Sequence, residues 1–185
     1  MTERSVRPAR LADLNRFAEV VGDYGFLIDR WMRQQNDQGV LFVAWLGTRP
    51  AGAVYLWLED AEEAPIRRHL PRVALLTHLE VTRELRNRGV GQALVAVAEQ
   101  HLRERGHERV ALAVRTDNAG AARLYRRLGY RYWDHGAVTC YARTTLPDGT
   151  VIEEPELCHV LVKDLVPVTP APRAEARPIG AANPC

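Results

Sequence analysis

The stretch Arg86-Asn-Arg-Gly-Val-Gly-Gln92 is the part of the chain whose residue types and spacing most clearly suggest chemistry. Its two glycines let backbone N–H groups come close to a ligand, and the helical pattern that follows adds the positive end of a helix dipole. Arg86 and Arg88 bring two further positive charges to the same place. The stretch therefore suits a phosphate-binding turn. The alternative is an ordinary strand-to-helix turn whose arginines are solvated.

Two common phosphate-binding motifs do not fit this stretch. The dinucleotide-binding fingerprint needs a third small residue at position 94, where the chain has Leu94. The triphosphate-binding loop needs Gly-Lys-Ser/Thr, and the stretch contains no lysine. A protein that binds nucleotides through either motif is therefore disfavoured.

Two longer patterns place this turn in a wider context. Residues 79–94 read Leu-Glu-Val-Thr-Arg-Glu-Leu-Arg-Asn-Arg-Gly-Val-Gly-Gln-Ala-Leu. A second pattern, Asn-x-x-Ala-x-x-Leu-Tyr-x-x-x-Gly-Tyr, is formed by Asn118, Ala121, Leu124, Tyr125, Gly129 and Tyr130. In order and distance, the two resemble the acyl-CoA-binding motif and the following signature of the GNAT superfamily of N-acetyltransferases. The resemblance covers about residues 6–165.

The resemblance implies that acetyl-CoA is the cosubstrate and that no metal is needed. The pyrophosphate would bind at the turn, whose expected contacts are Arg86, Arg88, Gly89, Val90, Gly91 and Gln92. Backbone atoms of Leu79 and Val81 would bind the pantetheine arm as an added β-strand, where their strand diverges from the strand at 110–114. Asn118 would reach the same arm with its side chain, a role that is compatible with capping the helix that follows.

The resemblance also assigns Tyr125 to the CoA sulfur. A thiol with a pKa of about 8.5 leaves as a thiolate and a phenol titrates near 10, so full proton transfer is uphill by roughly 2 kcal/mol. We therefore expect Tyr125 to stabilise the leaving sulfur mainly by hydrogen bonding. The alternative is an aromatic ring on the core face of a helix.

The amine acceptor must lose a proton before it attacks the thioester. The strand at 73–82 offers Thr77, His78 and Glu80 for this task. We expect Glu80 to act as the base, directly or through a water molecule; a solvated carboxylate at the strand end is the alternative. His78, which shares a face with Glu80 in a regular strand, is expected to be structural. A bulge in this strand would change that parity.

The function implied is transfer of an acetyl group from acetyl-CoA to a primary amine by direct attack, through a tetrahedral intermediate. Neither motif contains a cysteine, which disfavours an acyl-cysteine route. The alternative is a non-catalytic, acyl-CoA-binding regulatory module on the same fold. The acceptor is expected to be a small-molecule or peptide amine. Candidates to line its pocket are Asp23, Tyr24, Asp29 and Trp31. Four acidic residues could favour a cationic amine, with a solvated acidic loop as the alternative: Glu59, Asp60, Glu62 and Glu63.

The elements that must position these residues alternate between two patterns. Apolar residues at helical spacing predict helices at Leu11–Val21, Tyr24–Gln35, Val90–Arg105 and Ala119–Leu128. Apolar runs predict strands at Ser5–Ala9, Val40–Leu46, Ala53–Leu58, Val73–Thr82, Val110–Val114, Tyr130–Tyr141 and Leu157–Leu165. This order predicts an α/β fold. The resemblance implies a mixed, mostly antiparallel central sheet of six to seven strands flanked by about four helices.

Composition limits the class of protein. The 185 residues carry a net charge of +2, with 46% hydrophobic residues, which fits one domain at 1–165 and a proline-rich tail at 166–185. So small a charge does not indicate nucleic-acid binding, and no apolar run approaches the ~20 residues that cross a membrane. Three cysteines without metal-ligand spacing favour a cytoplasmic protein. A homodimer whose interface or flank the tail covers is a further expectation.

Overall fold

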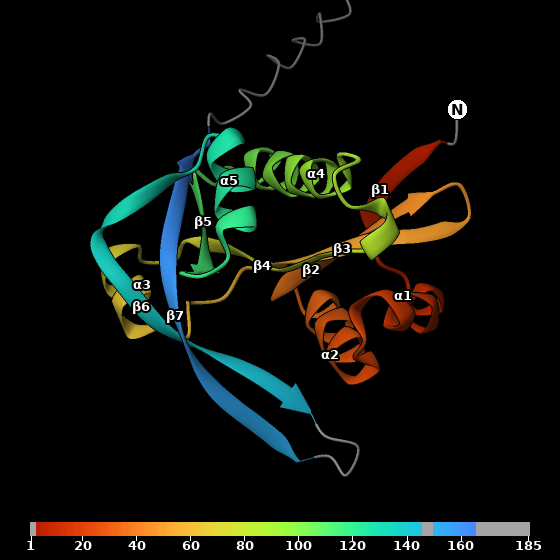
Figure 1. The fold of residues 1–185 in the computed structure, drawn as a ribbon, viewed down its shortest axis with the longest axis horizontal. Coiled ribbons are helices and arrows are strands. Elements are labelled where there is room, and N and C mark those ends of the chain that lie inside the picture. The colour runs from red at the N-terminus through yellow and green to blue at the C-terminus, as the bar shows by residue number, and fades with distance from the viewer. Residues whose placement is uncertain (1–2, 146–149, 166–185) are drawn as a thin grey trace, which may run out of the picture.

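A computed structural model describes residues 3–145 and 150–165 of the chain. Within these residues, seven strands form one sheet in the order β1-β2-β3-β4-β5-β7-β6 (Figure 1). The strands are β1 Arg4–Pro8, β2 Gly39–Leu46, β3 Arg49–Trp57, β4 Ala74–Val81, β5 Arg109–Arg115, β6 Arg131–Thr145 and β7 Val151–Asp164. Neighbouring strands run antiparallel except β4 and β5, which are parallel.

Helices cover both faces of this sheet (Figure 1). The α-helices are α1 Leu14–Val21, α2 Tyr24–Gln35, α3 Ala64–His69, α4 Val90–Glu104 and α5 Ala119–Arg127. Residues of α4 and α5 belong to one buried hydrophobic cluster, and residues of α1, α2 and α3 belong to a second. The two clusters are the cores on the two faces.

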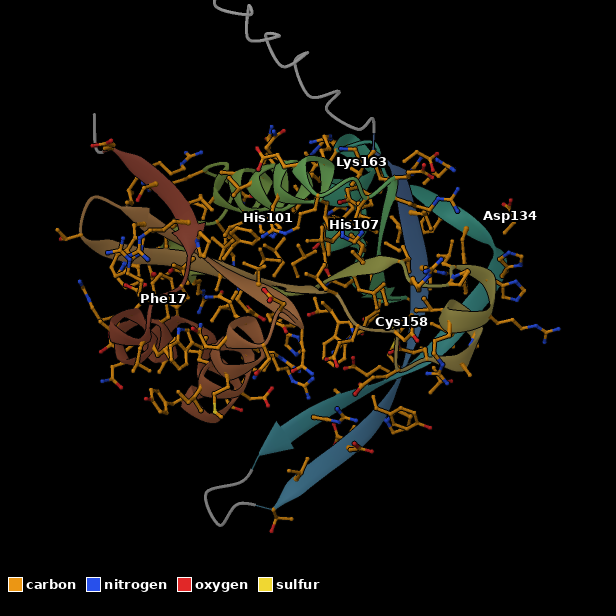
Figure 2. All side chains as sticks on the ribbon, turned by 180° about the vertical axis from the view of Figure 1, so that it is seen from behind. Phe17, His101, His107, Asp134, Cys158 and Lys163 are labelled. Carbon is orange, nitrogen blue, oxygen red and sulfur yellow. The ribbon has the colours of Figure 1, made fainter. Side chains whose placement is uncertain are left out.

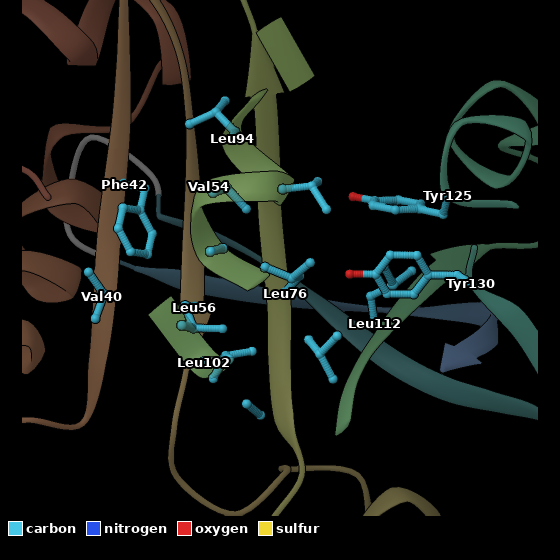
Figure 3. Packing of buried hydrophobic residues seen from close by; sticks show 14 of the residues in the cluster. Val40, Phe42, Val54, Leu56, Leu76, Leu94, Leu102, Leu112, Tyr125 and Tyr130 are labelled. Carbon is cyan, nitrogen blue, oxygen red and sulfur yellow. The ribbon is translucent and has the colours of Figure 1, made fainter. Parts of the chain in front are cut away.

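Alternate residues of the central strands supply these two cores, as the period of a strand requires. Phe42 and Val54 pack under α4 (Figure 3), whereas their neighbours Val43 and Tyr55 pack on the opposite face. Phe17 of α1 is fully buried in the second core, which Figure 2 shows from behind. Near-continuous apolar runs in β2 and β3 follow from burial on both faces.

β4 and β5 diverge soon after they meet. Only Ala74 with Val110 and Leu75 with Ala111 are paired between them in the described part of the chain. From residue 76 onward, the β4 edge that faces β5 therefore has no strand partner among the described residues. This divergence leaves a gap in the middle of the sheet.

β4 also carries a bulge beside this gap. Its register with β3 passes from Thr77 opposite Tyr55 to Glu80 opposite Ala53, so that two residues of β4 face one of β3. His78, the first of the two, has a φ of +51°, a conformation that non-glycine residues seldom adopt. Bulges redirect side chains. This one shifts the alternation of the strand: Leu76 and Leu79, three residues apart, both pack in the core under α4 and α5, while His78 packs against Phe26 on the opposite side.

The predicted α/β class and mostly antiparallel sheet are confirmed, while two helical elements differ from the prediction. The segment at 64–69 forms α3, where the sequence analysis expects no helix; its six residues are too few for a clear helical period. The helix expected at Leu11–Val21 starts as a 3₁₀ turn at Leu11–Asp13, and α1 begins only at Leu14. The Asp13 carboxylate fixes this turn by accepting a hydrogen bond from the Arg10 backbone N–H at 2.8 Å.

β6 and β7 are longer than the strands predicted at Tyr130–Tyr141 and Leu157–Leu165. Beyond the helices they continue as a two-stranded arm (Figure 1), in which Arg143 pairs with Glu153 at 2.7 Å. Residues of the arm are mostly exposed, so they lack the apolar alternation by which strands are recognised. The tail at 166–185 and residues 146–149 lie outside the described residues. Of the helices described, none is long and apolar enough to cross a membrane.

Candidate active site

The turn between β4 and α4 is held by side chains from outside it. Arg4 of β1 donates from Nη2 to the Arg88 carbonyl at 2.8 Å and from Nη1 to the Gly89 carbonyl at 3.3 Å. Arg86 donates from Nε to the Val81 carbonyl at 3.2 Å. Gly89 precedes the helix with a φ of +77°, a conformation that glycine adopts without strain. The turn is thereby fixed in one shape.

α4 begins directly after this turn, at Val90. The first N–H groups of a helix have no partner within the helix and carry the positive end of its dipole. At Gly91 an added Cβ would lie 3.6–3.7 Å from side-chain atoms of Leu79, Leu124 and Val81, so the bare glycine faces these three residues. Together they form part of the wall of a cavity of about 820 Å³, which we call the turn cavity.

Most of the predicted CoA-binding residues line the turn cavity. They are Leu79, Val81, Arg86, Gly89, Val90, Gly91, Gln92, Asn118 and Tyr125, and the predicted base Glu80 lines the cavity with them. Arg88 is absent from this lining: its side chain is exposed, and its carbonyl is held by Arg4. Asn87 and Arg127 line the cavity without having been predicted. Arg127 occupies one of the unspecified positions of the second motif, at the end of α5.

A second cavity, of about 390 Å³, lies at the gap between β4 and β5, and we call it the gap cavity. The two cavities share Leu79, Glu80, Asn118, Ala121 and Tyr125. The gap cavity is lined by Leu76 and Val114 from the core under α4 and α5, and by Trp57 and Ile66 from the opposite core. It therefore reaches both faces of the sheet through the gap.

Asn118 caps α5 beside this junction. Its side-chain oxygen accepts a hydrogen bond from the Ala121 backbone N–H at 3.0 Å, as the sequence analysis expects of a capping asparagine. Its own N–H donates to the Arg115 carbonyl at 3.0 Å. Arg115 is in turn paired with Asp117 at 2.6 Å and with Glu156 at 3.3 Å. These contacts fix the start of α5 relative to β5 and β7.

Tyr125 is buried at the place where the two cavities meet. Its ring packs edge-on against Tyr130, with 5.5 Å between the ring centroids, and both hydroxyls point the same way (Figure 3). No hydrogen bond among the described residues uses the Tyr125 hydroxyl, whereas that of Tyr130 donates to Glu99 at 3.0 Å. Burial, and secondarily the charge of Glu80, raise the pKa of Tyr125. Tyr125 is therefore a protonated donor at neutral pH.

His78 and Glu80 both line the gap cavity, and their side chains are open to it. Loss of hydration beside the surrounding protein lowers the pKa of His78 to about 4, and the positive charge of Arg30 contributes to a smaller extent. His78 is therefore neutral at pH 7. Its ring lies 4.3 Å from that of Phe26, between centroids. Glu80 alone of the two also lines the turn cavity.

The remaining wall of the gap cavity differs from the acceptor pocket suggested by the sequence. Of the eight candidates, Glu62 and Glu63 line the cavity and the other six do not. Asp23, for example, caps α2 by accepting from the Phe26 N–H at 2.9 Å. The wall instead includes Arg30, Trp57, Cys140, Tyr141, Glu156 and Cys158. None of these lies in a recognisable motif, because β3, α2 and the arm bring them together only in the fold.

Comparisons with known proteins agree with this geometry. Residues 9–130, about two thirds of the chain, match the sequence model of the acetyltransferase (GNAT) family. An uncharacterized N-acetyltransferase of Methanocaldococcus jannaschii is 30% identical over 104 residues, which make up 55% of this chain and 42% of that protein. A mycothiol acetyltransferase of an Arthrobacter species is 36% identical over 64 residues, or 35% of this chain and 20% of that protein. The chain thus spans less than half the length of these curated relatives.

A solved structure shares the fold. The PaiA N-acetyltransferase of Thermoplasma acidophilum, solved in complex with coenzyme A, is similar with a TM-score of 0.63 and 14% sequence identity. The similarity covers 88% of this chain and 99% of that one. By its sequence match and its fold, this chain belongs to the GNAT acetyltransferase family.

Proposed function

We propose that this protein transfers the acetyl group of acetyl-CoA to a primary amine by direct attack. The observation that carries the proposal is the junction of two cavities at the gap between β4 and β5. One cavity opens from the α4 and α5 face beside the turn at 86–91, and the other also reaches the face that carries α2 and α3. Two substrates that approach from opposite faces can meet at Glu80, Asn118 and Tyr125.

The turn cavity suits the phosphate-bearing part of acetyl-CoA. The free N–H groups at the start of α4 would bind the pyrophosphate, and the side chains of Arg86 and Arg127 would supply positive charge. The β4 edge at Leu79 and Val81 would bind the pantetheine arm through its backbone, as an added strand. Support comes from the divergence of β5, which leaves this edge without a strand partner among the described residues.

Acetyl transfer forms a bond between the amine nitrogen and the carbonyl carbon, and breaks the bond from that carbon to sulfur. Backbone N–H groups of the bulged part of β4 would stabilise the oxyanion of the tetrahedral intermediate. The Tyr125 hydroxyl would donate a hydrogen bond to the leaving thiolate. Its raised pKa favours donation without loss of the proton, since transfer to a thiolate of lower pKa is uphill.

The amine must also release a proton as its nitrogen attacks. We assign this proton to Glu80, directly or through one water, because Glu80 lines both cavities. His78 lies on the same stretch of β4 but lines only the gap cavity, so we assign it no part in the proton transfer. Neutral His78 would contribute to the wall of the acceptor side.

An assay of free thiol released from acetyl-CoA, run with a panel of primary amines, tests the proposal. We expect release that depends on the acceptor and obeys saturation. Calorimetric titration with acetyl-CoA runs in parallel. Tight binding of acetyl-CoA without acceptor-dependent release from any amine would overturn the enzymatic proposal in favour of a regulatory acyl-CoA-binding module.

A further inference from the structure

Arg30 is one of the residues that line the gap cavity, and its guanidinium is packed among aromatic side chains. It lies over three aromatic rings, with its central carbon 5.0 Å from the ring centroid of Phe26, 5.0 Å from that of Tyr55 and 5.1 Å from that of Trp57. Its side chain is 13% exposed. Aromatic faces favour a cation and restrict a planar group to few orientations. Arg30 is therefore a positive charge held in place at the cavity.

Much of the hydrogen-bonding capacity of Arg30 is unused. A guanidinium has five N–H donors; here Nη1 contacts Asp29 at 3.1 Å, and Nε has no hydrogen-bond partner in the described part of the chain. Asp29 is half exposed and also binds Arg33 at 3.1 Å. An anion that displaced Asp29 from Arg30 would therefore leave Asp29 with a partner.

The other charged residues in the wall of the gap cavity are four glutamates and Arg115. Its glutamates are Glu62, Glu63, Glu80 and Glu156. Arg143 pairs with Glu62 at 3.0 Å, and Arg115 pairs with Glu156 at 3.3 Å. Among the residues that the structure describes, Glu63 and Glu80 have no ion pair. The charges left to interact with a ligand are thus two carboxylates and the guanidinium of Arg30.

This arrangement suits a ligand that carries both signs of charge. We propose that the acceptor is an amino acid, or a similarly small amine that bears a carboxylate, and that Arg30 binds the carboxylate. The proposal rests on the proposed acetyl transfer, because it orients the amine of the same acceptor toward Glu80 and Tyr125. A carboxylate matches the planar fork of a guanidinium with two parallel hydrogen bonds.

The alternatives fit less well. A polyamine would bring a positive charge next to Arg30, and like charges in a partly buried site disfavour binding. A neutral hydrophobic amine would leave the Arg30 donors without a partner. The cavity of about 390 Å³ is at the small end of the usual range for small-molecule sites, which agrees with a single amino acid.

The test compares amino acids with their own carboxamides as acceptors. The two differ only in the carboxylate, so no substitution in the protein is needed for the first result. We expect the best amino acid to exceed its amide in kcat/KM by about 10- to 100-fold, the range for one charge-assisted hydrogen-bonded contact. The difference should lie mainly in KM.

Two variants then assign this preference to a residue. Arg30→Met should reduce the acid-to-amide ratio to near one, mainly by raising KM for the amino acid. Arg33→Met is the matched control, because Arg33 also lies over Trp57, at 5.0 Å, and binds Asp29, but does not line the gap cavity. It should keep the wild-type ratio. Thermal melting of each variant checks the fold, and the ratio within one variant cancels any loss of active protein.

The outcomes separate the two proposals. Acetylation of amides or decarboxylated amines as efficient as that of amino acids would overturn the role of Arg30 and leave acetyl transfer intact. An unchanged acid-to-amide ratio in Arg30→Met would do the same. No thiol release with any acceptor of either set would overturn the proposed function, and this inference with it.

Discussion

Gly91→Glu tests the proposed acetyl-CoA site with effects of opposite sign on binding and on stability. Gly91 is the second residue of α4, and an added Cβ would lie at the ordinary contact distance of 3.6–3.7 Å from its neighbours. A glutamate in the first turn interacts favourably with the helix dipole by about 0.3–1 kcal/mol. Replacing glycine removes a helix penalty of up to about 0.5 kcal/mol. The variant should therefore be at least as stable as the wild type.

Binding should change in the other direction, because the new carboxylate lies where the pyrophosphate is proposed to bind. Two unit charges 4 Å apart repel by about 4 kcal/mol at the effective dielectric constant of about 20 near a protein surface. Since about 1.4 kcal/mol corresponds to a factor of ten, the Kd for acetyl-CoA should rise by about 10³-fold. Isothermal titration calorimetry measures the Kd, and a thermal melt of the same sample measures stability.

Gly91→Gln is the matched control, since it has nearly the same shape without the charge. Its loss of affinity should be much smaller, and the difference between the two variants should shrink as salt is added. Ala96→Glu, on an exposed position of the same helix, controls for net charge. Wild-type affinity in Gly91→Glu, or equal losses in the Glu and Gln variants, would refute the electrostatic reasoning. Gly89 is less suitable, because its Cβ would point at the Arg4 guanidinium, 3.4 Å away.

Three further predictions follow from named contacts. Tyr125→Phe should lower kcat by about 10²–10³-fold, the usual range for losing one aimed hydrogen-bond donor. Affinity for acetyl-CoA and thermal stability should not change, because the Tyr125 hydroxyl has no partner in the described part of the chain. Wild-type turnover would leave Tyr125 with a packing role only. Lys163→Met removes the ion pair with Glu99 and should lower the free energy of unfolding, measured in urea, by about 2–3 kcal/mol. The loss is smaller than for a fully broken buried ion pair because Arg103 still pairs with Glu99. A loss under about 1 kcal/mol would contradict this. His78 has a pKa of about 4 in the folded protein against 6.5 as its ordinary value, so between these values the unfolded chain binds more protons and stability should fall as the pH falls. His78→Gln should flatten that part of the profile in urea unfolding, and a profile as steep as that of the wild type would count against it.

The residues that line the turn cavity could be predicted to lie together because they are close in the chain. Leu79, Gly89 and Gly91 lie within one strand, turn and helix start, and local geometry alone brings them to the turn cavity. Asn118 and Tyr125 follow from a second local pattern, a helix with its cap. A short-range pattern of this kind determines the local geometry of its residues without reference to the rest of the fold.

The wall of the gap cavity could not be predicted in the same way. Arg30 meets Trp57 and Tyr55 only because α2 packs on β3, and Tyr141 approaches only through the pairing of β6 with β7. Arg4 is 85 residues from the Gly89 carbonyl that it binds. Such contacts depend on the register of the whole sheet, which composition and periodicity do not determine. The acidic candidates Glu62 and Glu63 were found because the charges themselves are conspicuous.

The gap at which we propose that the two substrates meet also removes the hydrogen bonds that usually hold neighbouring strands. The structure replaces them with a polar brace on the α4 and α5 face. Glu99 of α4, whose side chain is 5% exposed, binds Lys163 of β7 at 2.7 Å (labelled in Figure 2) and accepts from the Tyr130 hydroxyl at 3.0 Å. Tyr130 in turn packs against Tyr125. Because an unpaired buried charge is costly, this brace keeps α4, β7 and the start of β6 in one arrangement, and with them the tyrosine at the junction of the two cavities.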